Sequence, residues 1–392
     1  MEKLLIQWME DNNKKHISMD ARSIQTKALS IFNQLKKQNE EKSLSFVASK
    51  GWLDKFKKRY NLHDIKFVSE AISTDKGATP EFVKSFKIFI ETNDYCPQQV
   101  FNANEFGLFW KRLPNRTFIS KEEKAGYNFK SAKDRLTLLF CGNASGDYKC
   151  KPFLIHHSAN PQVLKNIDKS HLPVHWKTNK NSWMTACLFE DWFINIFCPE
   201  VEEYCHLQKI PFKILLLLDN APSHPASLDQ LNPYVRVKFM TPNVTASIQP
   251  MDQGIITTFK KYYLKYIFKQ IFDKLKVDKQ LTLHDFWHNY NISDAIENIE
   301  KGWRDLKIST MNTAWKNLWP DCINFLRDDS CLLEAVDNSI TDIITIGQQL
   351  EGEGFYDLNV YDIEEVLQSH DAELTINDLI ELNQEDDMGE GE

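Results

Sequence analysis

Five aliphatic residues follow one another at Ile214–Leu218 and lead directly into Asp219. A short, continuous apolar run bounded by turn-forming residues is typical of a strand that is buried on both faces of a sheet. Such strands present functional groups at their ends, where the chain leaves the core. The run therefore predicts a covered sheet with Asp219 held at its edge. A second interpretation stays open, because an aspartate here can also start a turn or cap a helix.

The charge is distributed unevenly, although the net value is only −8. Residues 1–66 carry 14 Lys/Arg against 8 Asp/Glu, residues 67–327 are also basic, and residues 328–392 carry 20 Asp/Glu and no Lys or Arg. This asymmetry predicts a nucleic-acid-binding body and an acidic tail that is solvated or binds a partner. No apolar run approaches the roughly 20 residues of a membrane helix, and the N-terminus turns acidic too soon for a signal peptide. The scattered cysteines form no Cys-x-x-Cys pair, which indicates neither a zinc site nor a disulfide framework.

Residues 1–66 are predicted to form a small all-α domain of three helices. The third helix begins at about Ser49, with Trp52 and Phe56 facing inward. Its outer face carries five basic residues: Lys50, Lys55, Lys57, Lys58 and Arg59. A compact unit ending in a basic amphipathic helix suits a helix-turn-helix domain that places this helix in or beside the DNA major groove. The alternative is that the basic face is only solvated.

The rest of the chain is predicted to be a connector with one helix (67–95), a mixed α/β domain (96–275), a helical extension (276–327) and an acidic tail (328–392) that is partly disordered. Three early strands should form an antiparallel meander, over residues 100–110, 135–142 and 151–156. Residues 158–210 are expected to be mainly helical. A strand at 235–240 and a long helix at 252–275 should follow the Ile214–Leu218 strand.

Three segments resemble, in their order and spacing, the tigger branch of the pogo transposases: Phe101–Trp110, Asp219–Pro225 and Gln249–Gly254. The 33-residue separation of Asp219 and Asp252 and the residues around them make this pair specific. Residues 133–139 and 151–158 match as well. The N-terminal domain resembles the second helix-turn-helix unit of the centromere-protein-B type, so the chain is expected to start near that unit and to lack a first one.

The resemblance implies a ribonuclease-H-like mixed sheet flanked by helices over residues 96–275. In this family three acidic residues bind two Mg²⁺ or Mn²⁺ ions for phosphodiester cleavage and strand transfer. Anionic oxygen ligands are needed to hold two such ions close together. Asp219 and Asp252 are the implied metal ligands and catalytic residues.

Asn104 stands where the family pattern has the first metal-binding aspartate. Its amide oxygen can bind a metal, but it carries no charge and cannot bridge two ions. Glu105 is adjacent, but successive strand side chains point to opposite faces, so it cannot simply substitute. We therefore expect a degenerate core with weak or no metal binding and little or no cleavage. The opposing hypothesis is that Asn104 ligates one ion well enough for residual nicking.

The sequence thus favours a nuclear protein that binds double-stranded DNA, with a homodimer as a candidate assembly and with neither a membrane nor a small-molecule substrate as partner. An active metal-dependent endonuclease is the first alternative. A protein-interaction module without a DNA role is the second. The spacing of Lys261, Lys265 and Lys269 puts them on one helical face, which could follow a DNA backbone or simply be solvated.

Overall fold

The computed structural model describes residues 1–2, 4–6, 8, 21–38, 46–60, 78–112, 135–241, 244–323, 329–350, 355 and 357–370. The chain forms two compact units, residues 1–69 and 70–392, and each is described by itself. Residues 67–77 of the predicted connector, residues 133–134 and the end of the acidic tail after residue 370 lie outside the described residues.

The N-terminal unit contains the helices Ala21–Gln38 (α2) and Lys50–Arg59 (α3), and residues 2, 4–6 and 8 are also helical. Its core consists of five buried side chains: Leu5, Ile24, Ala28, Ile31 and Phe56. Trp52 stacks on Phe56 with ring centroids 5.3 Å apart. The apolar spacing within each helix brings these side chains to one side, so the predicted helical packing with Trp52 and Phe56 inside is confirmed.

The second unit is built around one mixed sheet of six strands in the order β4-β3-β2-β1-β5-β6. Strands β1 and β2, and β2 and β3, pair antiparallel, whereas β1–β5, β5–β6 and β3–β4 pair parallel. The strands are Val100–Phe109 (β1), Arg135–Asn143 (β2), Phe153–His156 (β3), His175–Thr178 (β4), Ile214–Leu218 (β5) and Val235–Phe239 (β6). The predicted meander and the buried strand Ile214–Leu218 are both confirmed.

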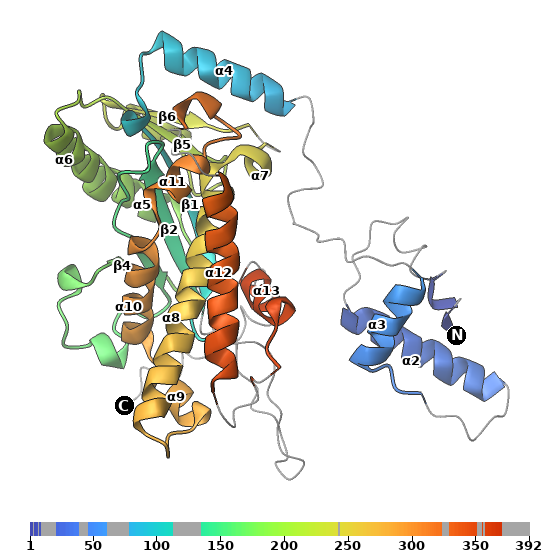
Figure 1. The fold of residues 1–392 in the computed structure, drawn as a ribbon. Helices are drawn as coiled ribbons and strands as arrows, with labels where there is room; N and C mark the ends of the chain where they lie inside the picture. The colour runs from blue at the N-terminus through green and yellow to red at the C-terminus, as the bar shows by residue number, and fades with distance from the viewer. Residues whose placement is uncertain are drawn as a thin grey trace. The chain divides into compact units, whose positions relative to one another are not determined.

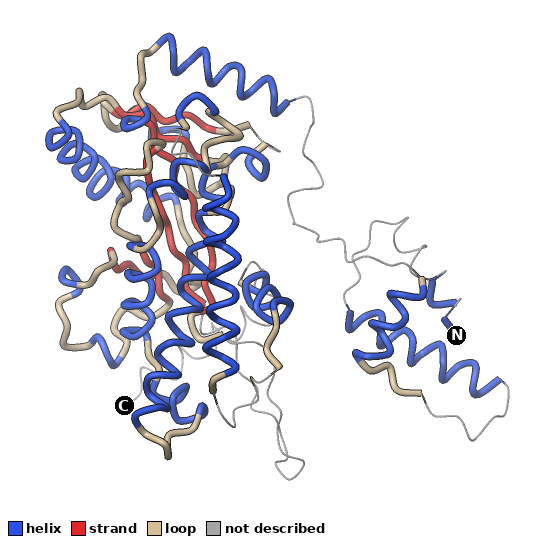
Figure 2. The backbone as a smooth tube through the Cα atoms, viewed as in Figure 1, coloured by secondary structure: helices blue, strands red, loops and turns tan. Residues whose placement is uncertain are grey.

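Helices cover both faces of this sheet, as Figures 1 and 2 show. Leu216 and Leu218 pack on one face among side chains of α5 and α6, whereas Leu215 and Leu217 pack on the other. The helices are Ala78–Thr92 (α4), Ala186–Trp192 (α5), Cys198–Gln208 (α6), Thr245–Ile248 (α7), Ile255–Val277 (α8), Leu283–Asn289 (α9), Ile292–Arg304 (α10), Ile308–Thr313 (α11), Asp329–Gln348 (α12) and Val360–Ser369 (α13). This is the ribonuclease-H-like α/β fold that the sequence predicts, with apolar side chains needed on both faces of the central strands.

The prediction that residues 158–210 are mainly helical is wrong for the first half of this segment. Strand β4 and two short 3-10 turns, Gln162–Leu164 and Lys169–His171, precede α5. The side chains of β4 are only partly buried, because β4 is the last strand of the sheet. A short edge strand of this kind shows neither an apolar run nor a clear alternation in the sequence.

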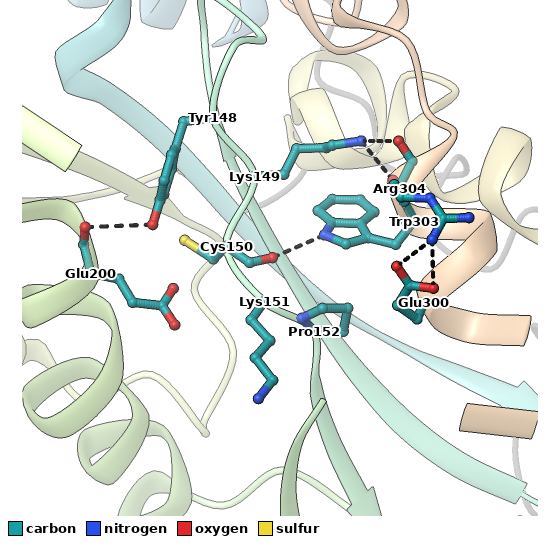
Figure 3. A pocket seen from close by; sticks show the side chains of 9 residues that line it. All are labelled: Tyr148, Lys149, Cys150, Lys151, Pro152, Glu200, Glu300, Trp303 and Arg304. Carbon is teal, nitrogen blue, oxygen red and sulfur yellow. Dashed lines mark hydrogen bonds and ion pairs between the residues drawn. The ribbon is translucent and has the colours of Figure 1, made fainter. Parts of the chain in front are cut away.

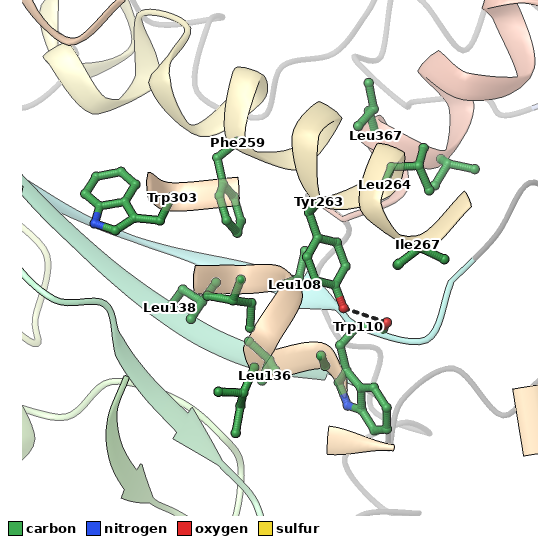
Figure 4. Packing of buried hydrophobic residues seen from close by; sticks show 14 of the residues in the cluster. Leu108, Trp110, Leu136, Leu138, Phe259, Tyr263, Leu264, Ile267, Trp303 and Leu367 are labelled. Atoms are coloured by element: carbon green, nitrogen blue, oxygen red, sulfur yellow. Dashed lines mark hydrogen bonds between the residues drawn. The ribbon is translucent and has the colours of Figure 1, made fainter. Parts of the chain in front are cut away.

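Part of the acidic tail is folded into the core. Helices α12 and α13 lie beside α8 (Figure 1). Ile343, Phe355 and Ile363 from this segment are buried in the same apolar cluster as α8 and the β1–β2 face. Figure 4 shows Leu367 of α13 close to Leu264 of α8. The described part of residues 328–392 is therefore an amphipathic packing element rather than a solvated tail.

The lysine face of α8 is not an open basic surface. Lys261 is buried, and the Lys265 ammonium donates to Asp342 of α12 at 2.5 Å. Lys269 is exposed. The three lysines therefore form neither a continuous basic surface for a DNA backbone nor a fully solvated face, because α12 covers part of α8.

Two further expectations from the sequence concern membrane-spanning helices and the cysteines. No helix in the described ranges is both long and apolar enough to cross a bilayer. Seven cysteines of this part of the chain are free thiols: Cys96, Cys141, Cys150, Cys187, Cys198, Cys205 and Cys322.

Candidate functional site

The parallel strands β1 and β5 bring Asn104 and Asp219 to the same level of the sheet. Their register pairs Asn102 with Leu217. Asn104 and Asp219 each follow two residues later, and Asp219 is the first residue after β5. Because side chains on a strand alternate, a step of two residues keeps the same face. The two positions therefore lie side by side on neighbouring strands.

Asn102 connects the segment Gln249–Gly254, which carries Asp252, to the edge of the sheet where Asn104 and Asp219 lie. Its side chain is fully buried, its Nδ2 donates to the Leu217 carbonyl at 3.1 Å, and its Oδ1 accepts from the Met251 amide at 2.9 Å. Met251 belongs to the 3-10 turn Pro250–Asp252, which precedes α8. One buried amide thus links β1, β5 and this turn, and it fixes where Asp252 projects.

Asn104 and Asp252 contact each other directly. The Asn104 Nδ2 atom donates to Asp252 Oδ1 at 2.8 Å, and Asn104 is buried. Gly254 follows with a φ of 103°, a left-handed conformation that suits glycine and lets α8 begin at Ile255. The structure therefore puts Asn104 and Asp252 in direct contact, and the strand register puts Asp219 beside Asn104.

Asp219 is bound from the other side by His224. The His224 Nδ1 atom lies 2.7 Å from Asp219 Oδ1, and its Nε2 atom lies 2.9 Å from Glu105 Oε1. The imidazole has no exposed surface and packs against the Phe189 ring at 4.2 Å between centroids. Burial disfavours the charged imidazole, but the hydrogen bonds and charges of Asp219 and Glu105 outweigh it and raise the pKa of His224 to about 10. His224 is therefore an imidazolium between two carboxylates at neutral pH.

The roles of Asn102, Glu105 and His224 are not apparent from sequence reasoning alone. Glu105 points to the face of the sheet opposite Asn104, as alternation requires. On the Glu105 face it meets His224, and the same imidazole also contacts Asp219. Asp219 also accepts from the Ala221 amide at 3.2 Å, so it forms the predicted turn as well. The one available signal was that His224 falls in the same short segment as Asp219.

These residues do not fit a site for two divalent ions. The Oδ1 atoms of Asp219 and Asp252 are each engaged by an N–H donor, His224 Nδ1 and Asn104 Nδ2 respectively. Asn104 adds no negative charge, and the imidazolium adds a positive one. Among the described residues, no group of three or more His, Cys, Asp or Glu side chains is arranged to hold a metal. The two carboxylates Asp219 and Asp252 are fewer than the three that the family resemblance implies for a pair of ions.

The basic helix α3 carries the predicted DNA-binding residues. Lys55 and Arg59 are exposed, and Arg59 pairs with Glu2. The Trp52 Nε1 atom also donates to Glu2, at 3.1 Å, so Glu2 fixes one end of this face. The structure describes the α3 backbone at three further predicted DNA-binding residues but not their side chains: Lys50, Lys57 and Lys58.

A groove of about 440 Å³ lies elsewhere, beside the connection from β2 to β3 (Figure 3). It shares no lining residue with the Asn104–Asp252 site. On its wall the Lys149 ammonium donates to the carbonyls of Trp303, Arg304 and Leu306 at 2.6, 3.0 and 2.8 Å. Lys149 thus satisfies carbonyls at the C-terminus of α10, where a cation is also favoured by the helix dipole.

Replacing Lys149 by Met should destabilise the protein by about 2 kcal/mol, because it leaves these carbonyls without their donor. Thermal or urea unfolding of the full chain measures this. Lys151→Met is the matched control, since Lys151 lines the same groove, and it should change stability by less than about 0.5 kcal/mol. Equal effects of the two substitutions would show that the three hydrogen bonds contribute nothing specific.

Comparison with known proteins places these features in a family. Residues 1–66 match the Tc5 transposase DNA-binding domain, and residues 133–315 match the DDE superfamily endonuclease family. The chain is 29% identical to Jerky protein of Mus musculus over 337 residues, which is 86% of this chain and 56% of that protein. It is 34% identical to Tigger transposable element-derived protein 7 of Homo sapiens over 289 residues, 70% of this chain and 52% of that protein.

The chain spans about half the length of these relatives. A crystal structure of the Mos1 mariner paired end complex with Mn covers 81% of this chain at 12% identity, but its TM-score of 0.31 is too low to add to the argument. The family is identified by the two family matches and by the sequence relatives. The chain belongs to the tigger-type transposase-derived proteins, with a Tc5-type DNA-binding domain followed by a DDE superfamily endonuclease domain.

Proposed function

We propose that this chain is a nuclear protein that binds double-stranded DNA through its N-terminal domain and whose transposase-derived core does not cleave DNA. The observation that carries the proposal is the contact from Asn104 Nδ2 to Asp252 Oδ1 at 2.8 Å. An amide donor occupies a carboxylate oxygen that a metal would otherwise bind. The remaining charge cannot hold two divalent ions against their mutual repulsion. A homodimer is part of the same proposal.

DNA binding is supported by the family match of residues 1–66 and by the composition of α3. Exposed cations on one helix can contact several phosphates of a duplex, and each contact releases counterions. Such contacts give affinity for any sequence, and base contacts from the same helix would add selectivity.

The triple substitution of Lys57, Lys58 and Arg59 by Ala should lower the affinity for duplex DNA roughly 10- to 100-fold at low salt, and about equally for different sequences. The slope of affinity against salt should fall with it. Fluorescence anisotropy over a salt series measures both quantities. The control removes three exposed lysines of the second unit: Lys84, Lys165 and Lys279. If the control weakens binding as much as the α3 variant, net charge rather than α3 accounts for binding.

The wild-type chain should not nick supercoiled plasmid with Mg²⁺ or Mn²⁺. Asn104→Asp should be less stable without metal, because it brings two carboxylates together at Asp252. Metal binding to the folded variant should then stabilise it by about 2–3 kcal/mol at a hundredfold excess over its dissociation constant. Thermal unfolding with and without Mg²⁺, beside the plasmid assay, measures these effects.

The competing hypothesis of an active endonuclease is favoured by one fact, the presence of both Asp219 and Asp252. It predicts nicking by the wild type that Asp219→Ala abolishes. That result would end the proposal of an inactive core but not the proposal of DNA binding. The interaction-module hypothesis instead predicts that neither the wild type nor the α3 triple variant binds DNA.

A further inference from the structure

The Glu2 carboxylate binds two side chains of α3 that are seven residues apart in the sequence. Its Oε1 atom accepts a hydrogen bond from Trp52 Nε1 at 3.1 Å and forms an ion pair with the Arg59 guanidinium. Seven residues are close to two turns of an α-helix, so Trp52 and Arg59 lie on the same side of α3. Glu2 therefore spans two turns of the helix that is proposed to bind DNA.

The core of the N-terminal unit holds this carboxylate in place. The Glu2 side chain is only 25% exposed. Its partner Trp52 stacks on the fully buried Phe56 at 5.3 Å between ring centroids and meets the Phe46 ring edge-on at 5.0 Å. Because the indole is fixed in this way, the carboxylate that it binds does not swing aside when a phosphate approaches α3.

Arg59 and Lys55 are neighbours on α3, because residues four apart lie next to each other on a helix surface. The Arg59 side chain is 47% exposed, and Lys55 is exposed as well. In the part of the chain that the structure describes, Lys55 pairs with no carboxylate, whereas Arg59 pairs with Glu2. A phosphate near α3 therefore meets the full charge of Lys55 but an Arg59 charge that a carboxylate already offsets.

We propose that Glu2 is an internal counter-ion that removes Arg59 from the cations with which α3 neutralises DNA phosphates. A cation adds to duplex affinity when it releases the counterions of a phosphate. Arg59 releases none while Glu2 supplies its negative charge, and an approaching phosphate is also repelled by the fixed carboxylate. Glu2 thus limits the affinity of α3 for any duplex, which leaves a larger share of binding to contacts that read bases.

The inference rests on the proposed DNA binding, and its test measures the affinity of the full chain for two duplexes of unrelated sequence over a salt series. Glu2→Gln keeps an acceptor oxygen for Trp52 but removes the charge, so the melting temperature should stay at the wild-type value. The affinity should rise about three- to tenfold at low salt, and the slope of log affinity against log salt should steepen by about 1, because one more phosphate is neutralised. Both duplexes should gain equally.

Substitutions of Arg59 show whether the gain depends on this side chain. Arg59→Ala should leave the salt slope of the wild type unchanged, but it should remove the added steepness in the Glu2→Gln background. Arg59→Lys in that background should keep the added steepness, because a phosphate contact needs the charge. Lys55→Ala is the matched control and should reduce the slope by about 1 in both backgrounds, since Glu2 does not bind Lys55.

A Glu2→Gln chain with the wild-type slope would overturn the inference, and so would a wild-type slope that falls by about 1 on Arg59→Ala. In both cases a loss of affinity in the α3 triple variant would still support DNA binding by α3. If no chain of the set binds duplex DNA, the inference and the proposed function both fail. If Glu2→Gln does not fold, the slope of Arg59→Ala alone still decides.

Discussion

Removal of residues 329–392 should unfold the second unit or leave it aggregated. The described part of this segment contributes a set of buried apolar side chains to the α8 core: Ile340, Ile343, Leu350, Phe355, Leu358, Ile363, Val366 and Leu367. At about 1.5–3 kcal/mol for each buried side chain, their combined loss matches or exceeds the roughly 5–15 kcal/mol by which whole domains are stable. Circular dichroism and size-exclusion chromatography of the truncated chain measure the outcome.

Point substitutions separate packing from charge in this segment. Ile343→Ala should cost about 3 kcal/mol, because Ile343 is fully buried on α12. Val360→Ala is the matched control, since Val360 is half exposed at the start of α13, and it should cost less than about 0.5 kcal/mol. A truncated chain that melts like the full one would mean that the segment is solvated after all.

His224→Ala should destabilise the second unit by about 3 kcal/mol, because it leaves Asp219 and Glu105 without the cation between them. For a unit of this size the melting temperature should fall by roughly 5 °C. Removing the imidazole also opens space beside Phe189, against which it packs. His206→Ala, at an exposed position on α6, is the matched control and should leave the melting temperature unchanged.

The pH dependence of stability tests the charge of His224. Its pKa is raised from 6.5 to about 10 in the folded protein. The folded state therefore keeps a proton that the unfolded state has lost between these values. The stabilisation is complete below about pH 6.5 and disappears as pH rises through about 10. The stability difference between the wild type and His224→Ala should shrink across this window, and a constant difference would argue for a neutral imidazole.

The core strands were predictable because their signals are local. An unbroken aliphatic run such as Ile214–Leu218 can bury all of its side chains only in a strand whose sheet is covered on both faces. Strand β4 gave no such signal, since an edge strand needs little apolar surface. In the acidic tail the apolar spacing of Ile363, Val366 and Leu367 is visible in the sequence, but only the structure shows that α8 provides the apolar face on which these side chains pack.

By itself, the sequence determined the buried strand, the basic helix α3, the pairing of Asp219 with Asp252 by family resemblance and the missing charge at Asn104. Only the tertiary structure decided what these residues contact. Asn104 donates to Asp252, and His224 binds both Asp219 and Glu105. Composition and spacing act along the chain, but hydrogen bonds and ion pairs depend on which side chains the sheet register brings within about 3 Å of one another.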